Sequence, residues 1–124
     1  MRLVVLESPF AGDVEKNLEY ARACMADCLK RGEAPYASHL LYTQPGVLND
    51  TKPEERKLGM EAGFAWGLKA DKTVVYVDRG MSNGMKEGIR RAQNASREIE
   101  YRALYKIICV GCGSEGDCPC QRHA

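Results

Sequence analysis

The fold is decided by residues 3–17, LVVLESPFAGDVEKN, in which four apolar residues lead into a polar turn that contains proline and glycine. The apolar run over residues 3–6 is too short for a buried helix, so it predicts a central parallel strand. Asp13 stands where a helix N-cap is expected, and apolar residues then recur every three or four positions until Gly32. A strand, a turn and a helix are therefore predicted to open the chain.

The alternation of strands and helices continues along the chain. Further strands are predicted over residues 34–41, 73–77 and 98–104, with 105–110 as a candidate edge strand. Helices are predicted over 53–70 and around Met85 to Ala92. The pattern predicts an α/β protein: a small flavodoxin-like or Rossmann-like three-layer sandwich with a mainly parallel sheet of four to five strands. We expect residues 1–104 to form this domain and residues 105–124 a cysteine-rich extension of it.

Size and charge narrow the classes of function. The 124 residues suit one domain, and 18 Lys and Arg against 17 Asp and Glu give a net charge of +1. Such a balance provides no long-range field to collect a nucleic-acid polymer or a membrane surface. The longest apolar run is far too short to span a bilayer, and nothing after it resembles a cleavage site. We expect a soluble, cytoplasmic protein whose partner is a small molecule.

Polar side chains follow the first three predicted strands. These residues are Glu7 and Ser8, Ser38 and His39, and Asp78 and Arg79. In open parallel sheets, ligands bind beyond the carboxyl ends of the strands, so the topology should bring these groups to one rim. His39 lies close to Tyr36 and could stack on a base or bond a sugar, although a structural histidine is the alternative.

The turn after the first strand suits a nucleoside better than a diphosphate. A pyrophosphate site needs consecutive backbone N–H groups, and Pro9 has none. Glu7, Ser8 and Phe10 instead provide an acceptor, a hydroxyl and a flat apolar wall. We expect residues 7–10 to form one wall of a nucleoside pocket.

Three acidic residues are candidates for catalysis, and each has a structural alternative. Glu61 has apolar neighbours at helical spacing, namely Leu58, Ala62, Ala65 and Leu68. Burial there would raise its pKa and suit a general acid or a nucleophile, whereas at the edge of the stripe it would only reach water. Glu87 lies near a helix start, where an acid needs no function. Asp78 could bind a ribose hydroxyl or cap the loop that follows it.

Three glycines lie four residues apart in the helix predicted over residues 53–70. Each of Gly59, Gly63 and Gly67 costs about 1 kcal/mol relative to alanine in a helix interior. Close approach of another helix, within the fold or across a dimer, would offset that cost. We therefore expect self-association, as a homodimer or a higher homo-oligomer.

The six cysteines fall into two groups. Cys24 and Cys28 are predicted to be small buried thiols of one helix, with a metal site as the alternative. The tail has the spacing C-x2-C-x5-C-x-C and contains Cys109, Cys112, Cys118 and Cys120. Four thiolates suit a structural zinc, and a reduced, metal-free tail is the alternative.

Five segments together resemble the nucleoside 2-deoxyribosyltransferase-like family of small phage and bacterial proteins. They are LVVLESPFAGDVEKN, APYASHLLYTQ, PEERKLGMEAGFAW, ADKTVVYVDRGMSNGMKEGI and EIEYRAL, within residues 1–104. The resemblance implies a flavodoxin-like domain in which a carboxylate attacks the anomeric carbon of a nucleoside or nucleotide. The glycosyl ester then passes to another base or to water, and no cofactor is required. It also makes Ser82, Gly84 and Met85 candidates for substrate binding.

One feature of the resemblance is displaced in this chain. The nucleophile of such transferases lies in a pattern like E-x-G-x-A, and counting back from Ala92 leads to Gly88. Glu87 is one residue away, about 100° around the helix. The pattern itself occurs one helix earlier, from Glu61. We therefore consider Glu61 or Glu87 as the nucleophile and Asp78 as its partner.

Two functions other than catalysis remain open. A protein that sequesters a nucleotide or a nucleotide-derived signal would explain the missing glutamate at position 88. A zinc-stabilised interaction module with a vestigial pocket is the third hypothesis.

Overall fold

A computed structural model describes residues 1–105 of the chain. Four strands and four helices follow one another in it. In chain order they are β1 (Arg2–Glu7), α1 (Val14–Lys30), β2 (Glu33–Tyr36), α2 (Ser38–Leu41), α3 (Pro53–Gly67), β3 (Lys72–Tyr76), α4 (Asn83–Asn94) and β4 (Glu98–Arg102).

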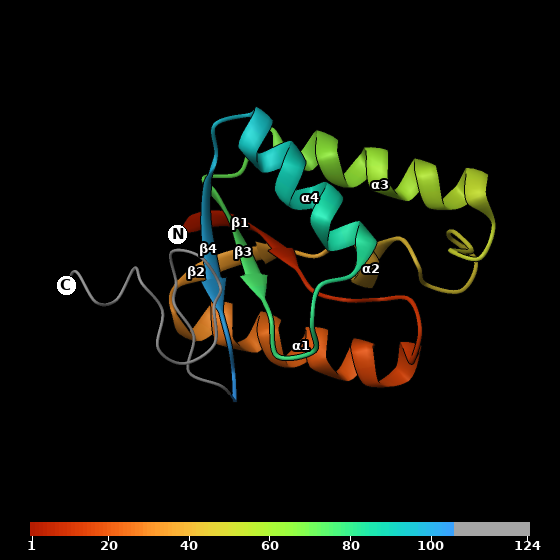
Figure 1. Cartoon of the computed structure of the whole chain (residues 1–124), viewed down its shortest axis with the longest axis horizontal. Coiled ribbons are helices and arrows are strands. Elements are labelled where there is room, and N and C mark those ends of the chain that lie inside the picture. Colours follow the sequence, from red (N-terminus) through yellow and green to blue (C-terminus); the bar gives the residue numbers. More distant parts are fainter. Residues whose placement is uncertain (106–124) are drawn as a thin grey trace.

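The strands form one parallel sheet in the order β2-β1-β3-β4. Helix α1 covers one face of it, and α3 and α4 cover the other (Figure 1). This is the three-layer α/β sandwich that the alternation of elements predicted, with four strands in the described part of the chain. Because all four strands are parallel, their carboxyl ends lie along one edge of the sheet.

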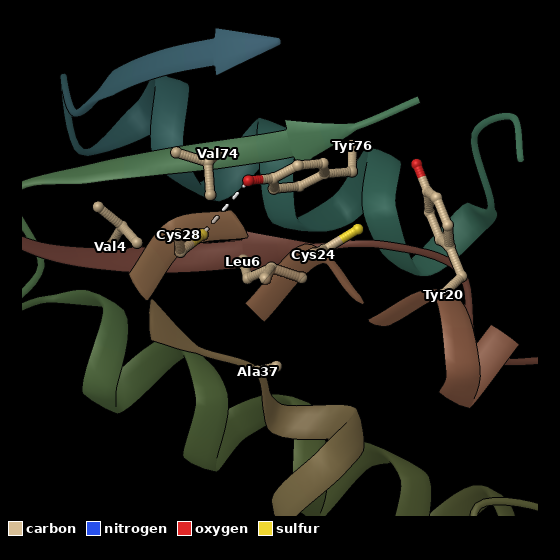
Figure 2. Close-up of a cluster of buried hydrophobic side chains, with 8 residues drawn as sticks. All are labelled: Val4, Leu6, Tyr20, Cys24, Cys28, Ala37, Val74 and Tyr76. Atoms are coloured by element: carbon tan, nitrogen blue, oxygen red, sulfur yellow. Dashed lines mark hydrogen bonds between the residues drawn. The ribbon is translucent and has the colours of Figure 1, made fainter. Parts of the chain in front are cut away.

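Two apolar clusters hold the layers together. On the α1 face, alternate residues of β1 and β3 pack against the helix, and the cluster contains Val4, Leu6, Tyr20, Cys24, Cys28, Ala37, Val74 and Tyr76 (Figure 2). On the other face, α4 packs against β3 through Val75, Val77, Met85 and Ile89. Cys24 and Cys28 are completely buried thiols, as the spacing of the apolar residues predicted.

The second strand is shorter than predicted. The strand expected over residues 34–41 ends at Tyr36, and α2 follows at once. Ala37 is buried against the α1 cluster and Leu40 packs on it from three residues further along. That spacing of three fits a helical turn and not a strand. Ser38 and His39 therefore belong to a helix that begins just beyond the sheet edge.

The ends of the other elements follow local signals. The Asp13 side chain caps α1 by accepting a hydrogen bond from the backbone N–H of Lys16. Ser82 caps α4 in the same way through the N–H of Met85. None of the helices in residues 1–105 is long and apolar enough to cross a membrane.

The cysteine-rich tail lies outside the described residues. The proposed edge strand beyond Tyr105 and the zinc ligands Cys109, Cys112, Cys118 and Cys120 all fall in it. The zinc site therefore stays a prediction.

Candidate functional site

A cavity of about 230 Å³ lies over the carboxyl end of the sheet, between α3 and α4. Its walls bring together most of the residues predicted to bind a ligand: Glu7, Ser8, Phe10, Tyr36, Ser38, His39, Ser82, Gly84 and Met85. Pro9 is buried and does not line the cavity. The volume is below the 300–1,000 Å³ of most drug-sized ligand sites, so the cavity suits a small ligand. The role of these residues in binding stays a prediction.

Ser8 and His39 form a hydrogen-bonded pair in the cavity wall. The Ser8 Oγ atom lies 2.7 Å from His39 Nε2, and Ser8 is almost fully buried. Burial lowers the pKa of His39 to about 4, so its imidazole is neutral at pH 7. The Phe10 ring meets the His39 ring edge to face, with centroids 6.4 Å apart. This wall therefore combines an uncharged polar pair with an aromatic surface.

Glu7 is the last residue of β1 and lies on the face that α3 and α4 cover. Its side chain lines the cavity and is partly buried. Burial raises the pKa of Glu7 to about 8, while the charge of Arg97 opposes that rise. Among the described residues no hydrogen bond contributes to the shift. A carboxyl group that is desolvated, without a hydrogen bond and open to a cavity is typical of a functional site.

Arg97 is fixed on the same face of the sheet. Its Nε atom donates to Thr73 Oγ1 at 3.0 Å and Nη1 donates to the carbonyl oxygen of Gly67 at 2.6 Å. Ser96 adopts a left-handed conformation (φ 55°) that turns the chain from α4 into β4, and Arg97 follows it directly. Arg97 therefore provides a fixed positive charge that opposes the rise in the pKa of Glu7 caused by burial.

Aromatic residues from three segments line or border the other side of the cavity. The Tyr36 and Trp66 rings lie 5.5 Å apart between centroids, and Trp66 Nε1 donates to the Tyr42 hydroxyl at 3.0 Å. The Tyr36 hydroxyl oxygen is buried and has no hydrogen-bond partner among residues 1–105. Unpaired buried hydroxyl groups are uncommon because desolvation is costly. Tyr36 lines the cavity through its ring, while its hydroxyl oxygen is buried beside it.

The three glycines of α3 face the cavity side and allow close approach within the fold. A Cβ atom on Gly63 would lie 3.1 Å from Ser38 Cβ, and one on Gly67 would lie 3.3 Å from Arg97 Nη2. Gly59 meets Leu48 in the same way, at 3.3 Å. The absence of side chains thus lets α2 and Arg97 pack against α3 without a second subunit, and self-association stays a prediction.

The apolar environment predicted for Glu61 does not exist in the structure. Because α3 turns its glycine side inward, the opposite face is exposed, with Leu58 56% and Leu68 75% exposed. The Glu61 carboxylate does not line the cavity, and within residues 1–105 its ion pair is an exposed one with Lys57 at 4.0 Å. The structure therefore corrects the basis on which Glu61 was considered a nucleophile.

Glu87 also lies outside the cavity. Its carboxylate pairs with Arg90 and Arg91 on the outer side of α4. Hydrogen bonds from Arg90, and more weakly from Arg91, lower the pKa of Glu87 to about 2. Glu87 is still rotated about 100° around the helix from position 88, as the sequence indicated, because α4 is continuous through both positions.

Asp78 lies just beyond β3, where it bonds to α1 and to the segment after β4, and it does not line the cavity. Its carboxylate accepts hydrogen bonds from the Tyr20 hydroxyl at 2.6 Å and from the backbone N–H groups of Leu104 and Tyr105 at 2.8 and 2.9 Å. Burial would raise the pKa of Asp78, but these hydrogen bonds outweigh it and lower the pKa. The structure thus gives Asp78 a capping role, and the capped segment follows β4.

Sequence reasoning named Glu7 as a ligand contact but missed its place as a strongly desolvated carboxyl group in the cavity wall. A signal was present, because an acid directly after four apolar residues alternates onto the same face as Val5. Arg97 was missed altogether. Nothing in its local sequence shows that it packs under a helix 30 residues earlier.

Comparison with known proteins shows the family of the chain. The model of a family described as "Domain of unknown function (DUF7768)" matches residues 2–102. The chain belongs to the DUF7768 family. Comparison with curated proteins gives no match.

A solved structure of similar fold is a 2-deoxyribosyltransferase from the psychrotolerant bacterium Bacillus psychrosaccharolyticus. The TM-score is 0.65 and the sequence identity 14%, over 88% of this chain and 78% of that chain. At this identity the likeness shows the fold alone. It supports the flavodoxin-like class for this DUF7768 chain and leaves its chemistry to be argued from the cavity.

Proposed function

We propose that the chain binds a nucleoside or nucleotide in the cavity and cleaves or exchanges its N-glycosidic bond through a carboxylate nucleophile. The observation that carries the proposal is the Glu7 carboxyl group, which is partly buried, lines the cavity and has a pKa raised by burial. Of the acids considered from the sequence, Glu61, Glu87 and Asp78 lie outside the cavity. Asp50 and Glu55 also line the cavity, but Glu55 accepts a hydrogen bond from the backbone N–H of Asn49 and pairs with Lys52, and the charge of Arg56 acts on Asp50. Among these acids Glu7 is the one whose pKa burial raises to about 8, so we assign the reaction to Glu7.

The surrounding side chains suit the two parts of a nucleoside. Phe10, Tyr36 and Phe64 offer flat apolar surfaces against which a base or sugar can pack. The Ser8–His39 pair can hydrogen-bond to hydroxyl groups or base edges. A few polar groups in an otherwise apolar cavity fix the orientation of a ligand.

The chemistry proceeds in two displacements. A carboxylate oxygen of Glu7 bonds to the anomeric carbon, and the bond from that carbon to the base nitrogen breaks. The electron pair stays with the base, which takes a proton from solvent. Water or a second base then attacks the anomeric carbon and gives its proton to solvent, the ester bond breaks, and its electron pair returns to the Glu7 carboxylate. Two inversions leave the configuration at the anomeric carbon unchanged.

The protonation state of Glu7 sets the pH dependence of this reaction. The nucleophile is the ionised form, and a pKa of about 8 leaves about one tenth of the free enzyme ionised at pH 7. The value of kcat/KM should therefore rise with pH and level off above pH 8. A fall in activity over the same range would show that Glu7 acts instead as a proton donor.

The second candidate function is binding without turnover. The mostly protonated state of Glu7 at neutral pH favours it, because a neutral carboxyl group is a hydrogen-bonding group and a poor nucleophile. A protein of this kind would retain a nucleotide unchanged in the cavity.

A substrate panel separates the two functions. The reduced, full-length protein is incubated with ribonucleosides, 2-deoxyribonucleosides and their 5′-monophosphates, with and without a free acceptor base, and the bases are quantified by chromatography. Release or exchange of a base that is lost in Glu7→Gln and kept in Glu61→Gln supports the proposal. A thermal shift with a compound that is recovered intact supports binding alone. No turnover of any compound would sink the enzymatic proposal.

A further inference from the structure

Residue 88 is a glycine on the buried side of α4, directly opposite Glu7. A Cβ atom built on Gly88 would lie 2.5 Å from the Glu7 carboxyl carbon and 2.8 Å from Oε1, with Oε2 closer still. Real Cβ atoms essentially never approach other heavy atoms within 3.0 Å. The Glu7 carboxyl group thus occupies the volume that a side chain at position 88 would need, and because it is the far end of a flexible side chain, a residue there would displace it from this position.

The backbone gives no other reason for this glycine. Gly88 lies in the interior of α4, and its φ is not in the left-handed region that favours glycine. A helix interior penalises glycine relative to alanine. Space for Glu7 is therefore the structural reason for Gly88.

The same space could receive a carboxyl group from the helix. In a glutamate the carboxyl carbon lies within about 2.5 Å of Cβ, and the Glu7 carboxyl carbon lies 2.5 Å from the Cβ position of Gly88. A carboxyl group carried by residue 88 would consequently lie within about 5 Å of the one that Glu7 carries now.

We propose that Glu7 and Gly88 form a matched pair. Glu7 places the reacting carboxyl group in the cavity from β1, and the absence of a side chain at Gly88 leaves space for it. A glutamate at position 88 of α4 could place a carboxyl group in the same space if residue 7 had none. That this carboxyl group reacts with substrate rests on the proposed function, whereas the steric pairing of Glu7 with Gly88 rests on geometry alone. Both residues line the cavity, so a carboxyl group transferred to α4 would face the same ligand. Arg97 stays anchored to Thr73 and Gly67 in either arrangement.

The reciprocal exchange tests the pair with four variants. They are Glu7→Ala, Gly88→Glu, the double variant Glu7→Ala/Gly88→Glu, and the control Glu7→Ala/Gly84→Glu. Gly84 is the matched control because it lines the same cavity one turn earlier on α4, and a Cβ there has no neighbour closer than 3.9 Å. Base release is measured on the substrate found with the panel, and thermal melting is measured for every protein.

We expect Glu7→Ala to lose about 10³-fold in kcat. The double variant should recover at least about a tenth of the original rate, and the Gly84 control should recover none. A mechanism-based 2-deoxy-2-fluoroarabinosyl nucleoside should label Glu7 in the original chain and residue 88 in the double variant, as peptide mapping would show. A folded double variant no more active than Glu7→Ala would overturn the exchange.

Melting temperatures test the pairing when activity cannot. Gly88→Glu alone should lower the melting temperature by about 5 °C or more, because two carboxyl groups then compete for one space. Removing Glu7 from that variant should restore most of the loss. Effects that simply add, without such recovery, would overturn the matched pair. Recovery of stability in a chain that turns over no substrate would keep the steric pair and reject the proposed function.

Discussion

Glu7 and His39 should together set how the stability of the fold depends on pH. In the folded chain burial raises the pKa of Glu7 from 4.5 to about 8 and lowers the pKa of His39 from 6.5 to about 4. Both shifts penalise the charged form, but they act in opposite directions on the protons that the folded chain binds. Between pH 4.5 and 8 the folded state holds a Glu7 proton that the unfolded state has released. Between pH 4 and 6.5 the unfolded state holds a His39 proton that the folded state excludes.

The signs follow from linkage. Stability falls with rising pH wherever the folded state binds more protons, so Glu7 lowers the free energy of unfolding by about 5 kcal/mol between pH 4.5 and 8. His39 raises it by about 3.5 kcal/mol between pH 4 and 6.5. The two contributions nearly cancel from pH 4.5 to 6.5. The chain as it exists should therefore lose about 2 kcal/mol between pH 6.5 and 8.

Two variants separate the contributions. Glu7→Gln keeps the shape and removes the titration, so its stability should rise from pH 4 to 6.5 and then stay level. His39→Gln should lose stability continuously from pH 4.5 to 8. The difference between Glu7→Gln and the original chain should grow by about 4 kcal/mol from pH 5 to pH 8. That growth is a large part of the 5–15 kcal/mol that stabilises a typical domain.

Urea unfolding followed by circular dichroism measures these differences. Each protein is unfolded at pH 5, 6.5 and 8 with reductant present. Where the m-values of two proteins agree, the difference in their unfolding midpoints gives the difference in stability. Groups other than Glu7 and His39 are shared by all three proteins, so their titration cancels in the differences. A constant gap between Glu7→Gln and the original chain from pH 5 to 8 would refute the desolvation of Glu7.

Three further predictions concern residues around the site. Asp78→Asn should lower stability by about 1–3 kcal/mol in urea unfolding, because it removes the charge that accepts three hydrogen bonds, and it should leave the KM of an identified substrate nearly unchanged. Gly63→Ala should cost about 1–3 kcal/mol in the same assay, since its Cβ would press on Ser38 at 3.1 Å; an unchanged midpoint would contradict this packing. Glu61→Gln and Glu87→Gln should keep base release within about twofold, since both carboxylates lie outside the cavity, and a large loss in either would return the nucleophile to that helix.

Local sequence signals predicted the helices and strands well where nearby residues supply the hydrogen bonds and the apolar face that an element needs. The run over residues 3–6 became β1, and Asp13 caps α1 as its position indicated. The second strand was predicted too long because an apolar stretch such as residues 37–41 fits either period. Only packing of Ala37 and Leu40 on the α1 cluster selects the helical one. Parallel topology brings the strand ends to one edge, and Glu7, Ser8, Ser38 and His39 line the cavity there. The other two residues expected at this rim, Asp78 and Arg79, do not line it and instead bond to Tyr20 and Asn17 of α1.

The carboxylates show where sequence reasoning fails. Glu61 has apolar neighbours at helical spacing, but α3 can bury only one face, and the glycine face fits closer to α2 and Arg97. Sequence periodicity locates an apolar stripe without showing which stripe meets the sheet. Glu7 was visible as a strand-end acid, but its desolvation depends on α4 and on the missing side chain at Gly88.

The sequence by itself determined the α/β alternation, the parallel sheet, the buried cysteines of α1 and the edge at which the cavity forms. These features follow from hydrophobic periodicity and chain connectivity, which act over short distances along the chain. Only the tertiary structure decided which carboxyl groups line the cavity and that Glu7 is the strongly desolvated one. The desolvation of Glu7 depends on its contact with Gly88, which lies 81 positions later in the chain. Neither β1 nor α4 determines that contact by its own sequence.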